Sequence, residues 1–238
     1  MGAIYKKEMR TYFTTPIGYI FAAALLLISA VAFSYTTIQS ATRETKTYFT
    51  LMIFVFIILV PVLTMKSFSE ERRTRTEQML LTSPVSLTGM VMAKFLAAMT
   101  MLMGTMLLTV VYYIPFALYK GDYDTSHLAI LVGDMIALFL IGSAFVGIGL
   151  LVSSLTENQM VACVVTILVL LVFLVISFGN SYINSYFIRS ILNWLSIFSR
   201  FGNFTNGIFD FGAVVYYASI SAVSVFLTVR VYEKRRWA

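Results

Sequence analysis

The sequence predicts an all-α integral membrane protein with six transmembrane helices. Of its 238 residues, 59% are hydrophobic and only 12% are charged, against roughly a quarter charged in ordinary soluble domains. The charges are bunched, so that runs such as 51–65 and 159–178 contain none. Each run approaches the ~20 residues that a helix needs to cross a hydrocarbon core of ~30 Å. A soluble protein of this length could not hide so much apolar surface from water.

Six apolar segments make up well over half of the chain. Backbone groups in lipid must form their hydrogen bonds internally, so these segments are expected to be helices, and none alternates like a membrane β-strand. The gaps 67–89 and 179–211 are too short for an independent catalytic domain, so residues 1–238 are expected to form one membrane domain. The expected spans lie at about 17–38, 49–66, 90–118, 128–153, 159–178 and 212–231.

The Lys and Arg residues set the expected orientation. Twelve of the seventeen fall on the side that holds both termini and the 67–89 gap, and five fall on the other side. Loops rich in Lys and Arg stay in the cytoplasm, so both termini are expected there. The twelve are Lys6, Lys7, Arg10, Lys66, Arg72, Arg73, Arg75, Lys94, Arg230, Lys234, Arg235 and Arg236; the five are Arg43, Lys46, Lys120, Arg189 and Arg200.

Residues 1–15 predict a helix that lies in the membrane interface. Apolar residues such as Ile4 and Tyr12 recur at helical spacing, with the charges mostly on the opposite side, which is typical of an interfacial amphipathic helix. Pro16 then marks the turn into the bilayer. A disordered basic leader is the alternative. Ala30-Val31-Ala32 resembles a signal-peptidase site after an apolar stretch, but the long polar leader before the apolar run favours an uncleaved first span.

The 179–211 segment is expected to be an extracytoplasmic re-entrant segment. One or two short helices would dip into the outer leaflet, with breaks around Gly179-Asn180 and Gly202-Asn203. A seventh span at 183–204 is the alternative, and it would place the basic C-terminus outside the cell.

The cytoplasmic gap 67–89 predicts a short charged helix that lies parallel to the membrane between the second and third spans. Ser67 and Glu70 have the capping-box spacing, which starts a helix by satisfying its free amide groups. Pro84 pushes the preceding residue towards an extended conformation and ends the helix. The two transmembrane helices on either side would hold both of its ends.

Opposite charges four residues apart would stabilise this loop helix. Glu71 with Arg75 and Arg73 with Glu77 are such pairs, each worth a few tenths of a kcal/mol. Residues 79–81 add an apolar patch at the far end. The alternative is a solvated charge run that only enforces topology, but the apolar patch and the proline stop favour a docking surface for a cytoplasmic partner.

The residue types leave little room for catalysis. The chain has one histidine, His127, and one cysteine, Cys163, which argues against a multi-histidine or cysteine-rich metal site. Paired intramembrane carboxylates and a Ser–His–Asp set within reach are also lacking. The net charge of +6 comes from basic residues beside the apolar spans, so we expect contact with the lipid surface and none with nucleic acid.

Asp134 lies about two turns inside the fourth span. A charged side chain in the bilayer core is costly by several kcal/mol, so Asp134 should face protein or water. A place on a gating or substrate path is one hypothesis. The alternatives are a structural hydrogen bond near the outer interface and a carboxylate that reaches water.

Four segments carry short motifs in a fixed order: the cytoplasmic loop, the Leu-Thr-Glu-Asn-Gln turn at 155–159, the approach to the last span, and the basic ending 230–237. Together they resemble the permeases of ABC type-2 transporters, in particular the gliding-motility-associated subset, over nearly the whole chain. Arg75 stands where those proteins usually have Gly. The matching loop residues are Thr76, Gln78, Leu80, Leu81, Thr82 and Pro84, and those before the last span are Phe201, Phe204, Gly207, Asp210 and Tyr217.

The resemblance implies a permease subunit that works as a dimer, either of identical or of related chains, in the bacterial cytoplasmic (inner) membrane. Each subunit would bind a separate cytoplasmic ABC ATPase, and the loop would act as the coupling helix. The chain lacks the Gly-x-x-x-x-Gly-Lys-Ser/Thr loop that cradles phosphate. It is therefore not expected to be an enzyme by itself or to hold a cofactor, and ATP with Mg²⁺ is expected on the partner.

The implied function is ATP-driven export or extrusion of a substrate. The alternative is a membrane scaffold or mechanical component of a motility or envelope machine that transports no substrate. An extracytoplasmic accessory protein could also bind. The residues expected at the interface with the ATPase are Glu70, Glu71, Arg72, Arg73, Arg75, Glu77, Gln78, Leu80, Leu81, Pro84 and Glu157.

Overall fold

The structure, a computed structural model, describes residues 1–39, 45–78, 86–113, 125–179, 192 and 196–237. This part of the chain is helical and contains no β-strand. The helices are α1 (Gly2–Thr14), α2 (Pro16–Phe33) with the π-helical turn Ser34–Gln39, α3 (Lys46–Arg73), α5 (Leu87–Thr109) with the 3₁₀ turn Val110–Tyr112, α7 (Thr125–Leu155), α8 (Gln159–Gly179), α10 (Ile197–Thr205) and α11 (Phe211–Trp237).

Within the described ranges, six helices are long and apolar enough to cross a membrane, which confirms the six expected spans. The main difference concerns the second span, which was expected to end near residue 66 and instead continues as α3 to Arg73. The candidate spans are Pro16–Ile38, Lys46–Arg73, Leu87–Tyr112, Ala129–Leu155, Gln159–Ser177 and Phe211–Arg236.

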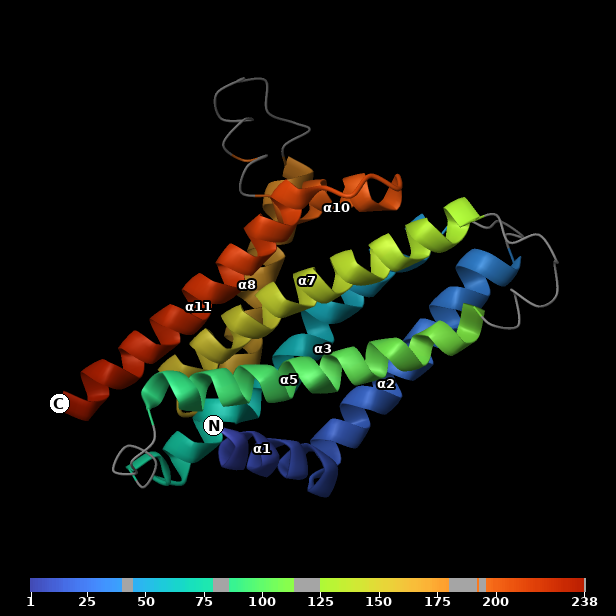
Figure 1. Cartoon of the computed structure of the whole chain (residues 1–238). Helices are drawn as coiled ribbons and strands as arrows, with labels where there is room; N and C mark the ends of the chain where they lie inside the picture. The colour runs from blue at the N-terminus through green and yellow to red at the C-terminus, as the bar shows by residue number, and fades with distance from the viewer. Residues whose placement is uncertain (40–44, 79–85, 114–124, 180–191, 193–195, 238) are drawn as a thin grey trace.

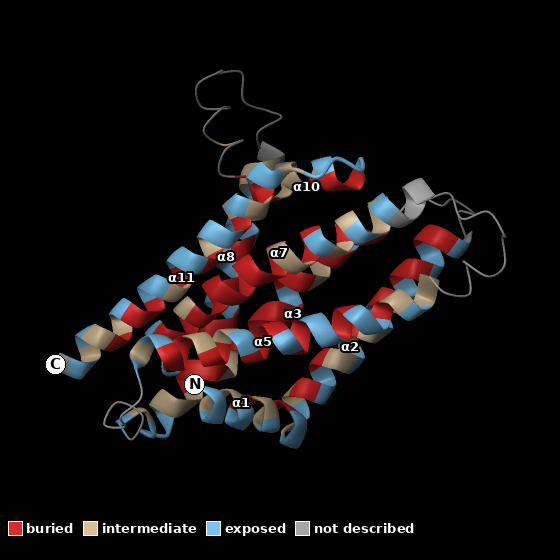
Figure 2. Cartoon of the chain, viewed as in Figure 1, coloured by how far each residue is buried: buried red, intermediate tan, exposed pale blue. Residues whose placement is uncertain are grey.

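The central helix of the bundle is α7. It packs against α3, α5, α8, α10 and α11, and 72% of its most apolar stretch is buried, against 22% for α8 and 28% for α2. At Gly149 of α7, a Cβ atom would collide with the hydroxyl of Thr64 on α3, so the missing side chain lets the two helices approach closely. Figure 2 shows the buried residues gathered along α3 and α7. The apolar side chains of α2 and α8 therefore point largely outward.

The N-terminal segment forms the helix expected over residues 1–15. Thr15 is extended, with φ −99° and ψ 153°, and Pro16 begins the next helix, a position where its missing N–H costs nothing. One side of α1 packs against α5 and α2. That side buries Tyr12, as the apolar spacing predicts, but it also buries Glu8. The place of α1 in the membrane interface stays a prediction.

The re-entrant segment predicted at 179–211 is described only in part. Helix α10 confirms a short helix there, but the predicted break at Gly202-Asn203 is wrong because both residues lie inside α10. The chain turns instead at Gly207, where φ is +76°, a value that glycine adopts without steric cost. The other predicted break, at Gly179-Asn180, falls where the described part of α8 ends.

The two ends of the bundle differ in what they hold. Figure 1 shows the N-terminus, the C-terminus and the last turns of α3 at one end, and α10 at the other. We call the first of these the charged end, formed by α1, residues 66–78, the α7–α8 turn at 153–158 and the last turn of α11. Lys and Arg side chains gather there, as the sequence predicts for one side of the membrane.

Candidate functional site

The charged end is built on the last two turns of α3. A new helix was expected to start at Ser67, but Ser67 lies inside α3, which runs without interruption to Arg73. The capping-box prediction is therefore wrong. A cap does not form at Ser67 because nothing in residues 62–73 breaks the helix. Inside a helix, the backbone N–H groups that a cap would satisfy already donate to carbonyls of the preceding turn.

The helix ends at Thr74, whose backbone N–H donates to the carbonyl of Glu70. Arg75 follows with φ of +58°, in the left-handed region that favours glycine. This is the position at which the similar permease loops usually have glycine. In this chain the left-handed conformation is adopted by a residue with a Cβ atom, which strains the backbone.

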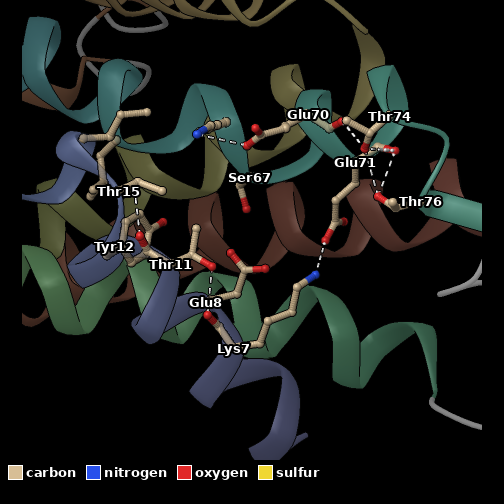
Figure 3. A pocket seen from close by; sticks show the side chains of 13 residues that line it. Lys7, Glu8, Thr11, Tyr12, Thr15, Ser67, Glu70, Glu71, Thr74 and Thr76 are labelled. Atoms are coloured by element: carbon tan, nitrogen blue, oxygen red, sulfur yellow. Dashed lines mark hydrogen bonds and ion pairs between the residues drawn. The ribbon is translucent and has the colours of Figure 1, made fainter.

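The i,i+4 pairs expected between Glu71 and Arg75 and between Arg73 and Glu77 do not form, because the helix has already ended. Glu71 binds two lysines instead. Its Oε2 lies 3.0 Å from Lys94 Nζ on α5, and its Oε1 lies 3.0 Å from Lys7 Nζ on α1 (Figure 3). Burial lowers the pKa of the Lys7 ammonium, but the charge and hydrogen bond of Glu71 outweigh burial and raise it above its usual value.

Lys94 is buried almost completely, with 1% of its side chain exposed. Its ammonium lies 3.1 Å from Glu8 Oε1, donates to the backbone carbonyl of Ser67, and sits 4.7 Å from the centre of the Phe68 ring. Together with Glu71, these partners take up all three ammonium donors. Such complete pairing is what makes a buried charge tolerable in an apolar span. It also ties α1, α3 and α5 together.

Arg72 connects α3 to the turn between α7 and α8. One guanidinium nitrogen lies 3.1 Å from Glu157 Oε1, and the other donates to the carbonyl of Leu155 over 2.8 Å. Arg72 and Glu157 were both predicted at the partner interface, and the structure brings them together. Deeper in the same junction, the Ser153 hydroxyl lies 3.2 Å from the backbone nitrogens of both Phe68 and Ser69.

The C-terminal helix reaches the same place through Arg235. Its guanidinium lies 3.2 Å from Glu77 Oε1 and donates to the carbonyl of Ser154 over 2.7 Å. Residues after α3 are thereby linked to α11 and to the end of α7. The end of α3 and the residues after it thus contact every other element of the charged end.

The remaining predicted interface residues differ in exposure. Arg73, Arg75 and Gln78 are exposed, whereas Glu70 is about one-third exposed and pairs with Lys66 at 3.3 Å. Leu80, Leu81 and Pro84 lie outside the described residues.

Sequence reasoning missed Glu8, Lys94 and Arg235 as members of this cluster. One signal was present for Lys94, since a lysine near the start of an apolar span needs a carboxylate partner. Which carboxylate it would find depends on tertiary packing: Glu8 is 86 positions away and Glu71 belongs to another span.

Asp134 lies away from the charged end and is fully buried. Thr45, the residue before α3, donates its hydroxyl to Asp134 Oδ2 over 2.9 Å. In the part of the chain that the structure describes, Asp134 Oδ1 has no hydrogen-bond partner. The structure therefore favours a carboxylate enclosed by protein over one that reaches water. Within the same residues, no group of three or more His, Cys, Asp and Glu side chains could hold a metal ion.

The described helices and the charged end define a multi-pass, all-helical membrane protein in which ion pairs connect the segments at one end of the spans. Residues 3–233 match the family described as ABC-2 family transporter protein, and the chain belongs to this family. It is accordingly a membrane permease subunit of an ABC transporter, which works with an ATP-binding subunit and is not itself the ATPase. A search of curated proteins found no match.

Proposed function

We propose that this chain exports or extrudes a substrate, driven by ATP and Mg²⁺ bound to a separate cytoplasmic ATPase that docks on the charged end. One observation carries the proposal. Arg73 and Arg75 are exposed at the tip of α3, while their neighbours Glu71 and Arg72 bind α1, α5 and the α7–α8 turn. A force applied by a partner at the exposed residues would reach several spans through these ion pairs.

The charge distribution supports a cytoplasmic location for the charged end. Both termini and the end of α3 gather there with most of the Lys and Arg residues, and such ends stay on the cytoplasmic side. A family member of this kind is proposed to lie in the bacterial cytoplasmic membrane. The outward-facing apolar surfaces of α2 and α8 leave room for lipid and for a second permease subunit, identical or related.

The mechanism we propose is a two-state equilibrium of the permease dimer. ATP binding to the ATPase pair would favour one state only if the permease contacts the ATPase differently in the two states. The Arg72–Glu157 pair is suited to such a difference, because it joins two segments at the surface and Glu157 is 64% exposed. Asp134 is proposed to lie on the gating or substrate path, since one of its buried oxygens finds no hydrogen-bond partner among the described residues.

The test is co-expression with candidate ABC ATPase subunits from the same genome. Arg73→Glu combined with Arg75→Glu should weaken ATPase association and should abolish stimulation of ATP hydrolysis by the reconstituted permease. Lys46→Glu is the matched control, because Lys46 is an exposed cation at the opposite end of α3, and it should leave both measurements unchanged.

Three outcomes would count against parts of this proposal. Normal association and stimulation in the double variant would exclude the tip of α3 as the docking site. A permease that binds no ATPase would exclude the transport mechanism. A complex whose ATPase activity responds to no transported substrate would favour the alternative function, a membrane scaffold or mechanical component.

A further inference from the structure

A cavity of about 320 Å³ lies between α1 and the last turns of α3 (Figure 3). At about 30 Å³ for each water molecule, this volume would hold roughly ten waters. The ion pairs described above border the cavity but do not fill it. A space of this size next to a membrane surface is large enough for the polar headgroup of a lipid.

Ser67 provides the first indication of an occupant. Its hydroxyl is buried, with the residue 7% exposed, and it finds no hydrogen-bond partner among the described residues. Figure 3 shows the Ser67 side chain directed into the cavity. Buried hydroxyl groups in native proteins are nearly always hydrogen-bonded, so an occupant with a polar atom near Ser67 is expected.

The charges around the cavity indicate what kind of polar group it takes. Lys7 and Lys66 line it together with Glu8, Glu70 and Glu71, and the buried ammonium of the nearby Lys94 offsets the extra carboxylate. An anion alone would meet the three carboxylates, and a cation alone would meet the lysines. A group that carries both charges suits the lining best.

Lys66 and Glu70 are placed to receive such a group. They pair with each other at 3.3 Å, and their side chains are 24% and 34% exposed, so each retains unused hydrogen-bonding positions. A headgroup phosphate could bind Lys66 and the Ser67 hydroxyl, while a headgroup ammonium binds Glu70. The surface pair would thereby be replaced by two charge-assisted contacts to the ligand.

The rest of the lining indicates that the ligand is a lipid. Ile17, at the start of α2, and Leu63, inside α3, form part of the wall on which the charged residues also lie. Both belong to candidate membrane spans. An apolar region that passes into charged residues reproduces the order of acyl chain and headgroup at a bilayer surface.

We propose that this cavity is a binding site for a phospholipid whose headgroup contains a phosphate and a primary ammonium, as in phosphatidylethanolamine. The lipid would fill the space between the N-terminal helix and α3 and would satisfy Ser67. This inference rests on the membrane fold and on the cavity; it requires neither the ATPase nor a direction of transport.

The test measures lipid retained by the full chain in native mass spectrometry. Protein is released from nanodiscs that contain equal amounts of phosphatidylethanolamine, phosphatidylcholine and phosphatidylglycerol. We expect phosphatidylethanolamine to be retained preferentially. Lys66→Gln should reduce its retention about tenfold, the size expected for loss of one charge-assisted contact. Lys234→Gln removes an equally positive but exposed side chain of the charged end and should change nothing.

A second variant guards against a folding defect in the first. Ser67→Met fills the cavity without changing charge and should also abolish preferential retention, whereas Ser219→Met at an exposed site of α11 should not. Equal retention of zwitterionic and anionic lipids would overturn the proposal. Unchanged retention in Lys66→Gln and Ser67→Met proteins of normal thermal stability would overturn it as well. Displacement by soluble phosphoethanolamine at the same concentration would overturn the assignment to a lipid.

Discussion

Lys94 Nζ lies 3.1 Å from Glu8 Oε1, although the two residues are 86 positions apart and one belongs to an apolar span. The pair is almost entirely buried, and Glu71 completes it from a third helix. A charge can remain in such a place only with its partners present, since separating it from them leaves an uncompensated charge. The N-terminal helix is therefore part of the bundle and not an appendage to it.

Replacement of Lys94 by methionine should destabilise the protein strongly. Lys94→Met leaves Glu8 and Glu71 as facing carboxylates, and the loss of one partner of a buried ion pair is worth roughly 3–5 kcal/mol. The measurement is the thermal unfolding midpoint of the purified chain in detergent. Lys6→Met, at an exposed site of the same charge, is the control. Combining Lys94→Met with Glu8→Gln and Glu71→Gln should recover part of the loss; no recovery would argue against the triad.

Replacement of Arg75 by glycine should stabilise the fold. Its φ of +58° is costly for a residue with a Cβ by roughly 1–2 kcal/mol, so Arg75→Gly should raise the free energy of unfolding by about 1 kcal/mol after the entropic loss of adding glycine. Arg73→Gly is the control within the last turn of α3, and it should lower stability by a similar amount. A lower midpoint for both variants would contradict the strain assigned to Arg75.

Asp210 should make stability depend on acid pH. The hydrogen bond from the Asn203 amide, aided by the backbone of Ala213, holds the pKa of the Asp210 carboxyl below its usual value. A lowered pKa means that the carboxylate stabilises the fold above about pH 4, and this contribution disappears as the pH falls through the lowered value.

The check is a series of thermal unfolding midpoints between pH 6 and pH 3. Asp210 precedes α11 and accepts from the backbone N–H of Ala213, as an N-cap residue does. Asp210→Asn keeps this type of cap but cannot titrate, so it should flatten the curve in that range, whereas Asp210→Ala should lower stability by about 1 kcal/mol at pH 6. An identical pH dependence in the original and Asp210→Asn proteins would refute the assignment.

Asp134 offers a test that separates stability from function. Among the described residues, one oxygen of its buried carboxylate has no hydrogen-bond partner. An unsatisfied buried group costs about 1–3 kcal/mol, so Asp134→Leu should leave the thermal midpoint unchanged or raise it. If Asp134 lies on the transport path, the same variant should lose substrate-stimulated ATPase activity in the complete transporter. Asp134→Asn, which can still accept from Thr45, serves as the conservative comparison. Full activity in Asp134→Leu would remove the proposed role.

The sequence predicts the six spans and the N-terminal helix well because each depends on local composition. Long apolar runs and the proline at position 16 act within a few residues of the structure they determine. The end of α3 was predicted less well for a related reason. The Ser67–Glu70 spacing matches a cap, but a cap forms only where the preceding residues leave the helix, and here they continue it.

The partners inside the charged end could not be predicted from local patterns. Glu71 was expected to pair four residues along the chain with Arg75, and it pairs instead with lysines of α1 and α5. Ion-pair choice depends on which helices pack together, and hydropathy contains no information about that. Arg72 and Glu157 were both predicted at the ATPase interface, because their turns were placed at the same membrane surface, but their pairing was not predicted.

Because α3 is one continuous helix, a movement at one of its ends would be transmitted to the other. Its 28 residues, at about 1.5 Å each, extend about 42 Å. One tip holds Glu71 and Arg72, and at the other Thr45 donates to Asp134. A rigid tilt of about 5° would move one tip roughly 4 Å relative to the other over that length, enough to break a hydrogen bond of 2.9 Å. Pro61 lies inside α3 and has no N–H to donate, so a bend of the helix there would shift the two ends in the same way as a tilt.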